Sequence, residues 1–379
     1  LRVDGLSLQQ ADGELALHSI SLGARLAEAS WNLQDVQVRA DGIELAGKAA
    51  MGPQAPHQLE ASLQGAFTAA EVGVVRATAH LSGTALAPRF DLQVSAPARL
   101  RATGGLDLGG LVPGFEVDAA WSLFGWPLEG PRTVQSSDGR LQLQGTAEAY
   151  RVHLETALSG PDIPPTQVTL KASGDTRGLQ LAPLHLDTLS GRLSAQGPLR
   201  WDPQLTWDLA LRAEGLDPGV QFPEWPGRLA GQLHSSGELG PQGPGLRVEI
   251  AGLEGTLREQ PVRASGAIRY RAGELQAQQL DIASGPNRLR LDGRADTQFD
   301  LAFSLDAPEL GALYPALSGR MTGQGRLDGT PAMPLLQAQL EVSELGLGAL
   351  RVATLQLQAD WGESGGRAVL QARELVSGE

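Results

Sequence analysis

The chain has 379 residues, a formal net charge of −13 and no cysteine. The absence of cysteine excludes thiolate metal sites, cysteine nucleophiles and disulfides, and an acidic chain without Lys/Arg clusters is poorly suited to bind nucleic-acid phosphates. Aromatic residues make up only 4%, whereas Gly 48 and Pro 24 are frequent, which favours many strands joined by turns over long helices.

From the first residue, apolar and polar side chains alternate with a period of two, which predicts antiparallel strands. The pairs Asp12-Gly13 and Asp41-Gly42 are typical of tight hairpin turns. Between 106 and 131 the chain becomes rich in Gly, Pro and Trp, and we interpret this segment as a crossing loop. Alternation returns after it, and Asp138-Gly139 and Ser190-Gly191 are read as further turns.

An internal repeat organises the second half of the chain. Residues 207–232 align without a gap on residues 299–324, with nine identities that are mostly Gly, Pro and Arg. Each copy predicts one alternating strand, a Pro-containing crossing loop, and a Gly-Arg pair that opens the next strand. Helical signals are scarce: only 24–30, 69–75 and 308–317 are expected to form a turn or two of helix.

About two dozen strands of about five residues, each apolar on one face only, leave one face of the sheet without a cover. Three arrangements solve this problem: closure as a barrel or sandwich, a filled β-helix, or an open trough that holds an apolar ligand. The Leu/Ala/Val lining, poor in aromatics, favours the trough. The residues predict an all-β fold, an elongated and repeating antiparallel sheet; its curling into a U-shaped groove with an apolar interior is what the family resemblance given below implies.

The pattern also predicts how the chain is organised. It opens and closes in the middle of the pattern, so we expect an internal fragment of a longer protein. Four groove repeats are expected, with these boundaries: 1–105, 106–206 (opening with the crossing segment), 207–298, and 299–379 (truncated).

No pattern of catalytic residues is found. The six histidines are scattered singly, and neither a G-x-S-x-G elbow nor a phosphate-binding G-x-x-x-x-G-K-[ST] loop occurs. We predict a protein that is not an enzyme, with no cofactor, no metal and no nucleic-acid partner.

Several short segments of the chain resemble the TamB family of AsmA-like proteins. They are LSGRL (189–193), GPLRWDP (197–203), WPGRL (225–229), LYP (313–315), GRLDGTP (325–331) and WPL (126–128). The resemblance implies repeating β-groove units in the periplasm of a Gram-negative bacterium, an inner-membrane anchor outside this chain, and a C-terminal domain, also outside it, that engages a TamA-type outer-membrane barrel. It further implies movement of phospholipids between the two membranes.

We interpret the chain as a hydrophobic conduit segment in which acyl chains lie in the groove and headgroups stay in water. The alternative is a periplasmic scaffold for the insertion of outer-membrane β-barrel or autotransporter proteins, and a filled β-helix serving as a spacer is a third interpretation. The residues expected to line the groove are Leu179, Leu181, Leu184, Leu186, Leu193, Leu209, Leu211, Leu229, Leu233, Leu246, Val248, Ile250, Leu289, Leu291, Leu301, Phe303, Leu340 and Val342.

Overall fold

The structure is a computed structural model that describes residues 2–10, 13–27, 30–40, 42–69, 73–128, 130–241, 243–295, 298–314, 316–330, 333–347, 350–362 and 365–377. As predicted, the fold is all-β. Among the described residues, the helical elements are one 3-10 turn, η1 (Pro218–Val220), and one short α-helix, α1 (Leu310–Leu313). The chain divides into two compact units, Leu1–Leu186 and Asp187–Glu379, called unit 1 and unit 2 below.

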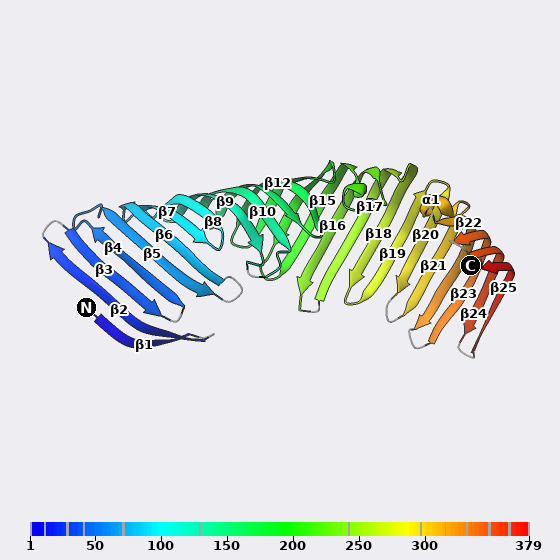
Figure 1. Ribbon diagram of the computed structural model, residues 1–379, viewed down its shortest axis with the longest axis horizontal. Coiled ribbons are helices and arrows are strands. Elements are labelled where there is room, and N and C mark those ends of the chain that lie inside the picture. Colours follow the sequence, from blue (N-terminus) through cyan, green and yellow to red (C-terminus); the bar gives the residue numbers. More distant parts are fainter. Residues whose placement is uncertain are drawn as a thin grey trace. The chain divides into compact units, whose positions relative to one another are not determined.

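Unit 1 is an antiparallel sheet in which each strand from β1 to β12 pairs with the next in the chain. Its strands, which Figure 1 labels except for β11, are β1 (Arg2–Gln10), β2 (Gly13–Ala27), β3 (Ser30–Ala40), β4 (Ile43–Met51), β5 (Leu59–Ala69), β6 (Gly73–Thr84), β7 (Ala87–Ala96), β8 (Arg99–Asp107), β9 (Gly114–Trp126), β10 (Val134–Thr146), β11 (Ala149–Gly160) and β12 (Ile163–Asp175). Strand β13 (Gly178–Thr188) contains the boundary between the units.

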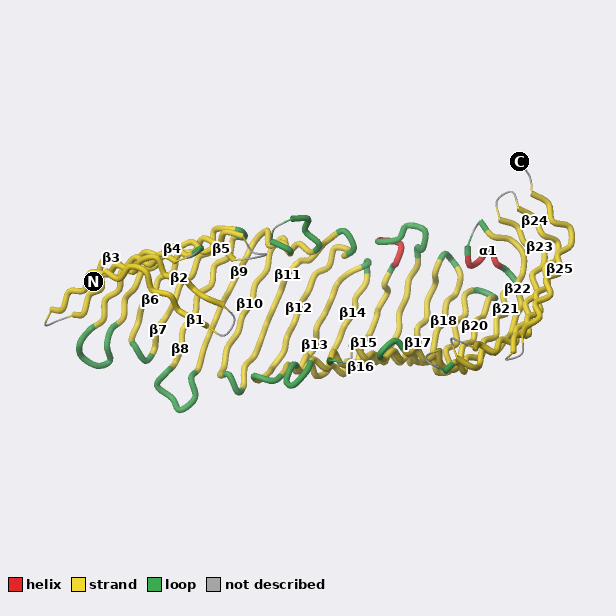
Figure 2. The backbone as a smooth tube through the Cα atoms, turned by 90° about the horizontal axis from the view of Figure 1, so that it is seen from below, coloured by secondary structure: helices red, strands yellow, loops and turns green. Residues whose placement is uncertain are grey.

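Unit 2 repeats this plan, and the tube in Figure 2 shows its strands lying side by side with α1 at one end of them. Consecutive strands pair antiparallel from β14 to β25. They are β14 (Gly191–Arg200), β15 (Leu205–Leu216), β16 (Gly227–Gly240), β17 (Gly243–Leu257), β18 (Gln260–Arg271), β19 (Glu274–Ser284), β20 (Asn287–Ala295), β21 (Phe299–Ala307), β22 (Leu317–Thr330), β23 (Met333–Leu347), β24 (Leu350–Gly362) and β25 (Gly365–Ser377).

The strands are 9 to 15 residues long, so the expected length of about five residues was wrong. The reason lies in β-bulges, where one extra residue shifts the alternation by one. In β19 the pairing steps from Ala277 to Leu280, and Gln279 between them has a φ of 47°. Left-handed residues also accompany register shifts at Asp35 in β3 and Glu344 in β23. In sequence, such a three-residue step looks like the end of one strand and the start of another.

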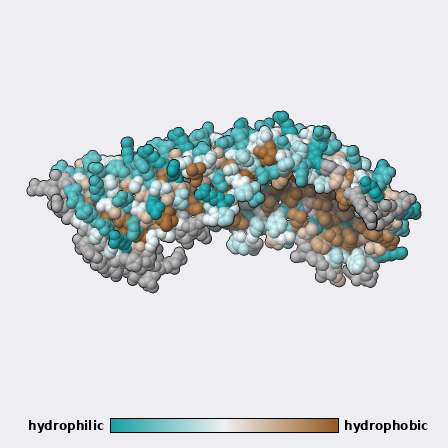
Figure 3. Space-filling model, in the orientation of Figure 1, coloured by the Kyte–Doolittle hydropathy of each residue, from teal (hydrophilic) through white to brown (hydrophobic). Residues whose placement is uncertain are grey.

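The bulges also have a geometric effect, because an extra residue bends its strand and increases the local twist of the sheet. Figure 3 shows the apolar residues of unit 2 gathered in a hollow, with hydrophilic residues along its upper side. The predicted apolar groove therefore corresponds to a curved, open sheet rather than to a closed one.

Two expectations about local structure need correction. Residues 114–126, expected to be part of a crossing loop, form strand β9, so among the described residues 108–113, 127–128 and 130–133 lie between strands there. Asp138-Gly139 is not a hairpin turn but lies inside β10 at a bulge, whereas Ser190 does sit in a turn, with a φ of 57°.

Of the three segments expected to form helical turns, one is confirmed. The segment 308–317 contains α1, as predicted. Of 24–30, residues 24–27 belong to β2, residue 30 begins β3, and 28–29 lie outside the described residues. Of 69–75, residue 69 ends β5, residues 73–75 begin β6, and the remainder also lies outside the described residues.

The strand, loop and strand order of the repeat is confirmed, but the Gly-Arg pair opens the next strand only in the first copy, because β16 begins at Gly227 whereas β22 begins at Leu317, two residues before Gly319. Strand β15 leads through the η1 loop into β16, which begins at Gly227, and β21 leads through the α1 loop into β22. Asp217 closes the first loop, because its Oδ1 accepts hydrogen bonds from the backbone N–H groups of Gly219 (2.9 Å) and Gly227 (2.8 Å).

Replacing Gln279 by glycine tests the left-handed bulge. Relief of the positive φ should raise the free energy of unfolding by about 0.5–1 kcal/mol, measured by urea denaturation with circular dichroism. The control is Gln276→Gly, at a regularly paired position of the same strand, which should lower stability by about 0.5–1 kcal/mol. Equal losses in both variants would contradict the role assigned to the bulge.

Candidate functional site

The candidate site is the apolar face of the sheet. In an antiparallel pair, directly opposed residues point to the same face, so the pairing register defines rows of side chains that run across the strands. One row crosses all twelve strands from β14 to β25 without a polar residue. Its members, in order, are Leu193, Ala213, Gly231, Leu253, Ala264, Ile282, Leu289, Leu305, Gly323, Leu340, Leu357 and Leu370.

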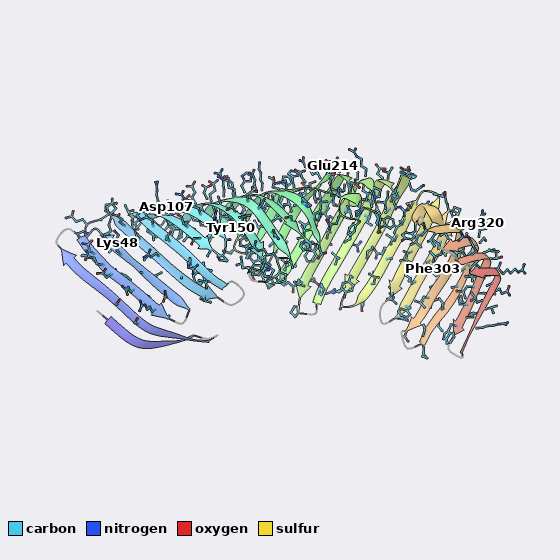
Figure 4. The ribbon with its side chains drawn as sticks, viewed as in Figure 1. Lys48, Asp107, Tyr150, Glu214, Phe303 and Arg320 are labelled. Atoms are coloured by element: carbon cyan, nitrogen blue, oxygen red, sulfur yellow. The ribbon has the colours of Figure 1, made fainter. Side chains whose placement is uncertain are left out.

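All the predicted lining residues of unit 2 lie on this face. Leu193, Leu289 and Leu340 belong to the row itself. The other predicted residues are two or more positions from a row member along the same strand and point to the same face, or they pair with residues that do. They are Leu209, Leu211, Leu229, Leu233, Leu246, Val248, Ile250, Leu291, Leu301, Phe303 and Val342. Phe303 and Arg320, both labelled in Figure 4, lie on opposite faces of the sheet: Phe303 on the apolar face and Arg320 on the polar face.

The remaining predicted residues, Leu179, Leu181, Leu184 and Leu186, lie in β13 within unit 1. All four are at buried or half-buried positions, and Leu181 is 8% exposed. The exposed positions change from even numbers (180 and 182) to an odd one (187), so the alternation shifts by one residue between them. This shift explains why leucines of both parities occupy the less exposed positions.

Unit 1 carries an equivalent row, which the sequence analysis did not name. It crosses β3 to β12 through Val38, Leu45, Gly65, Ala77, Val94, Leu100, Trp121, Gly139, Thr156 and Val168. Its single polar member, Thr156, donates a hydrogen bond to the Asp138 carbonyl (2.8 Å) and lies 2.7 Å from the Ser136 hydroxyl. The hydroxyl is thereby satisfied within the protein.

The apolar face is incompletely covered. Leu275 is 48% exposed, Trp361 51% and Leu370 62%, whereas the buried apolar residues are mostly alanines. Among the described residues, Val342 is the largest side chain that is less than 2% exposed. Much apolar surface is therefore accessible to a ligand.

Aromatic rings on the apolar face lie flat against glycines of the neighbouring strand. Trp207 covers Gly237, and Trp121 covers Gly139, because a Cβ added at either glycine would overlap the indole ring. The indole N–H groups donate to Ser235 Oγ (3.1 Å) and Ser136 Oγ (2.8 Å), respectively. Large rings are thus accommodated without rising above the face, and their polar atoms are satisfied internally.

The same arrangement recurs with phenylalanine: Phe90 lies over Gly104 and Phe303 over Gly325. These glycines are therefore packing residues inside strands. In the sequence, glycine predicts turns first, and the signal that identifies a packing glycine instead is its position in a strand directly opposite an aromatic residue.

At one edge of unit 2 the two repeat loops meet the sheet. Beneath α1 lies a small packed cluster in which Ala307 is 0% exposed, Asn287 3% and Leu310 5%. The Asn287 side chain holds the α1 loop: its Nδ2 donates to the Glu309 carbonyl (2.9 Å), and its Oδ1 accepts from the Glu309 N–H (3.1 Å). The side chains beneath α1 are therefore among the most deeply buried of the described residues.

The opposite face of the sheet carries the charged side chains, several of which form ion pairs. Arg101 Nη2 lies 2.6 Å from Asp91 Oδ2, and Arg326 bonds both Asp300 and Asp328 at 2.9 Å. The hydrogen bond from Arg101 lowers the pKa of Asp91 below its ordinary value. A hollow of about 910 Å³ on this face of unit 2 is lined by charged side chains such as Arg212, and is unsuited to acyl chains.

Within the described ranges, no group of three or more His, Asp or Glu side chains is placed to hold a metal ion. None of the described helices is long and apolar enough to cross a membrane.

An open sheet of consecutive antiparallel strands, uncharged on one curved face and charged on the other, defines an all-β groove protein. Residues 1–367 match the family described as "TamB, N-terminal domain". The chain is also 29% identical over 250 residues, 65% of its length, to the "Translocation and assembly module subunit TamB" of Haemophilus influenzae, of which it covers 19%. The chain belongs to the TamB N-terminal domain family, and it spans about a fifth of the length of that relative.

The contact between rings and glycines gives a direct test. Gly237→Ala forces a Cβ into the Trp207 ring, and we expect the free energy of unfolding to fall by about 1–3 kcal/mol in urea denaturation. Gly252→Ala is the control, since nothing lies within 4 Å of its added Cβ, and its effect should stay within about 0.5 kcal/mol. A similar loss in both variants would show that the ring does not rest on Gly237.

Proposed function

We propose that the chain is a conduit segment that carries phospholipids through the periplasm, with acyl chains on the apolar face and headgroups in water. The observation that supports this proposal most directly is the row from Leu193 to Leu370, which crosses twelve strands without a polar side chain. Membership of the TamB family supports it further. In this proposal the whole protein is anchored in the inner membrane and engages a TamA-type outer-membrane barrel through segments outside the chain.

The energetics favour both binding and movement. Each methylene that leaves water contributes about 0.8 kcal/mol, so an acyl chain on the apolar face is stabilised by many kcal/mol relative to free solution. With strands about 4.8 Å apart, the twelve-strand row extends for about 50 Å, longer than a single acyl chain. Because neighbouring positions offer nearly the same Leu/Ala/Gly surface, a lipid moves along the row with little change in free energy.

The side chains on the apolar face also offer an acyl chain a suitable surface. Rings that lie on glycines leave no bulky obstacle, and internally bonded indole N–H groups leave no polar atom that an acyl chain would have to desolvate. The lining role of the leucines, of Phe303 and of the four β13 positions is part of this proposal.

A charge placed on the apolar face should stop lipid passage. We expect the amount of lipid that co-purifies with Leu211→Arg or Phe303→Arg to be at least about tenfold lower than with the wild-type chain. The reason is that a buried guanidinium without a partner is strongly disfavoured. The measurement is native mass spectrometry of the purified chain, followed by complementation in cells.

The matched controls are Ala210→Arg and Ala302→Arg, which add the same charge one residue away on the exposed polar face. They should retain wild-type lipid and function. Full complementation by Leu211→Arg and Phe303→Arg would rule out a conduit in this segment.

The name of the Haemophilus relative, a subunit of a translocation and assembly module, favours a second candidate function. In that function the sheet presents its apolar face or a strand edge to unfolded outer-membrane proteins, which add as further strands.

A photo-crosslinking residue at position 211 or 303 separates the two functions. The conduit predicts adducts with phospholipid, detected by mass spectrometry of the crosslinked chain, whereas the scaffold predicts adducts with nascent barrel protein. The same probe at position 210 is the control and should give neither adduct. A chain with no adduct at 211 or 303 would instead behave as a structural spacer.

A further inference from the structure

Arg258 lies at the rim where the apolar face of unit 2 ends. It belongs to the turn between β17 and β18, in which Arg258 and Glu259 have φ values of 52° and 65°. The preceding residue, Leu257, pairs with Gly227 and lies on the apolar face. Arg258 therefore follows directly after the last residue of β17 that lies on the apolar face.

The side chain of Arg258 is held between the two repeat loops. Its guanidinium carbon lies 5.3 Å from the centroid of the Trp225 ring, in the η1 loop. Its Nη1 donates to the Leu313 carbonyl in α1 at 2.7 Å, and its backbone N–H donates to the Pro226 carbonyl at 2.6 Å. These contacts fix the guanidinium in place and use only one of its five N–H donors.

The charge of Arg258 has no counter-ion within the part of the chain that the structure describes. Only Arg247 and Arg258 are half-buried among the arginines whose side chains are described, and Arg247 is paired with Glu249 at 2.7 Å. The other arginines that lack a carboxylate partner are exposed to water. Arg258 is thus partly desolvated, pre-positioned and supplied with free donors, which is the condition that favours binding of an anion.

We propose that Arg258 binds the phosphate of a phospholipid whose acyl chains lie on the apolar face of unit 2. This inference rests on the conduit function and adds a headgroup position to it. The guanidinium matches phosphate oxygens bidentately. Around it, Trp225 is 37% exposed, Tyr314 48% and Phe222 61%, so three amphipathic or apolar rings stand at the level between the acyl chains and water. The repeat places Phe222 and Tyr314 at equivalent positions of the two loops.

The experiment compares two ligands with the same acyl chains, phosphatidylglycerol and diacylglycerol, which differ in the phosphate. Binding to the purified 379-residue chain is measured by native mass spectrometry for the wild type, Arg258→Gln, Arg258→Lys and the control Arg212→Gln, whose charge lies on the polar face beside Glu214. We expect the wild type to prefer phosphatidylglycerol by about tenfold. Arg258→Gln should lose this preference, Arg258→Lys should keep part of it, and Arg212→Gln should match the wild type.

Diacylglycerol binding separates this role from a purely structural one. If Arg258 only held the loops together, Arg258→Gln would weaken both ligands equally, and the proposal would be wrong. A wild type that binds both ligands without preference would overturn the headgroup site but leave the conduit intact, whereas binding of neither would overturn the conduit itself. The last measurement uses inorganic phosphate alone as the ligand. If phosphate binding depends on Arg258 while the wild type shows no preference between the two lipids, the position binds free phosphate and the lipid assignment is wrong.

Discussion

The alternation of side chains along a β-strand must stay in phase from one strand to the next, and the whole apolar face depends on this constraint. A slip of one residue would exchange the apolar and polar faces of every following strand. In β17 the pairing steps from Ile250 to Leu253, yet both residues remain on the apolar face because the bulge absorbs the extra residue. The bulges therefore curve the sheet while preserving the separation of its faces, and they connect the local chain geometry to an apolar surface that continues across a unit.

The apolar face also has to accommodate large aromatic rings between its smaller side chains. Trp207 over Gly237 and Phe303 over Gly325 show how rings are fitted to the sheet: the neighbouring strand lacks a Cβ where the ring needs space. The charges are confined to the other face, where pairs such as Arg101 with Asp91 cross between strands. The two faces thus differ in chemistry, since one carries the charges and the other presents apolar side chains.

Much of this arrangement could be predicted from residues alone. The period of two identified the strands, and the repeat from Trp207 correctly located a strand, a crossing loop and the strand that begins at Gly227. The strand lengths could not be predicted, because a step such as Ala277 to Leu280 has the same appearance whether a strand bulges or ends. The segment 114–126 was misread because its Gly and Trp content resembles that of a loop. The contact of Arg258 with Leu313 joins residues 55 positions apart, beyond the reach of any local pattern.

The pairing of each strand with the next one in the chain has a consequence for how such a protein changes in evolution. Because the contacts within each unit are made almost entirely between neighbouring hairpins, the gain or loss of one hairpin leaves the remaining pairs intact. Each added hairpin lengthens the sheet by about 10 Å without altering its cross-section. The length of such a sheet can therefore change in small increments, one hairpin at a time, while its two faces stay the same.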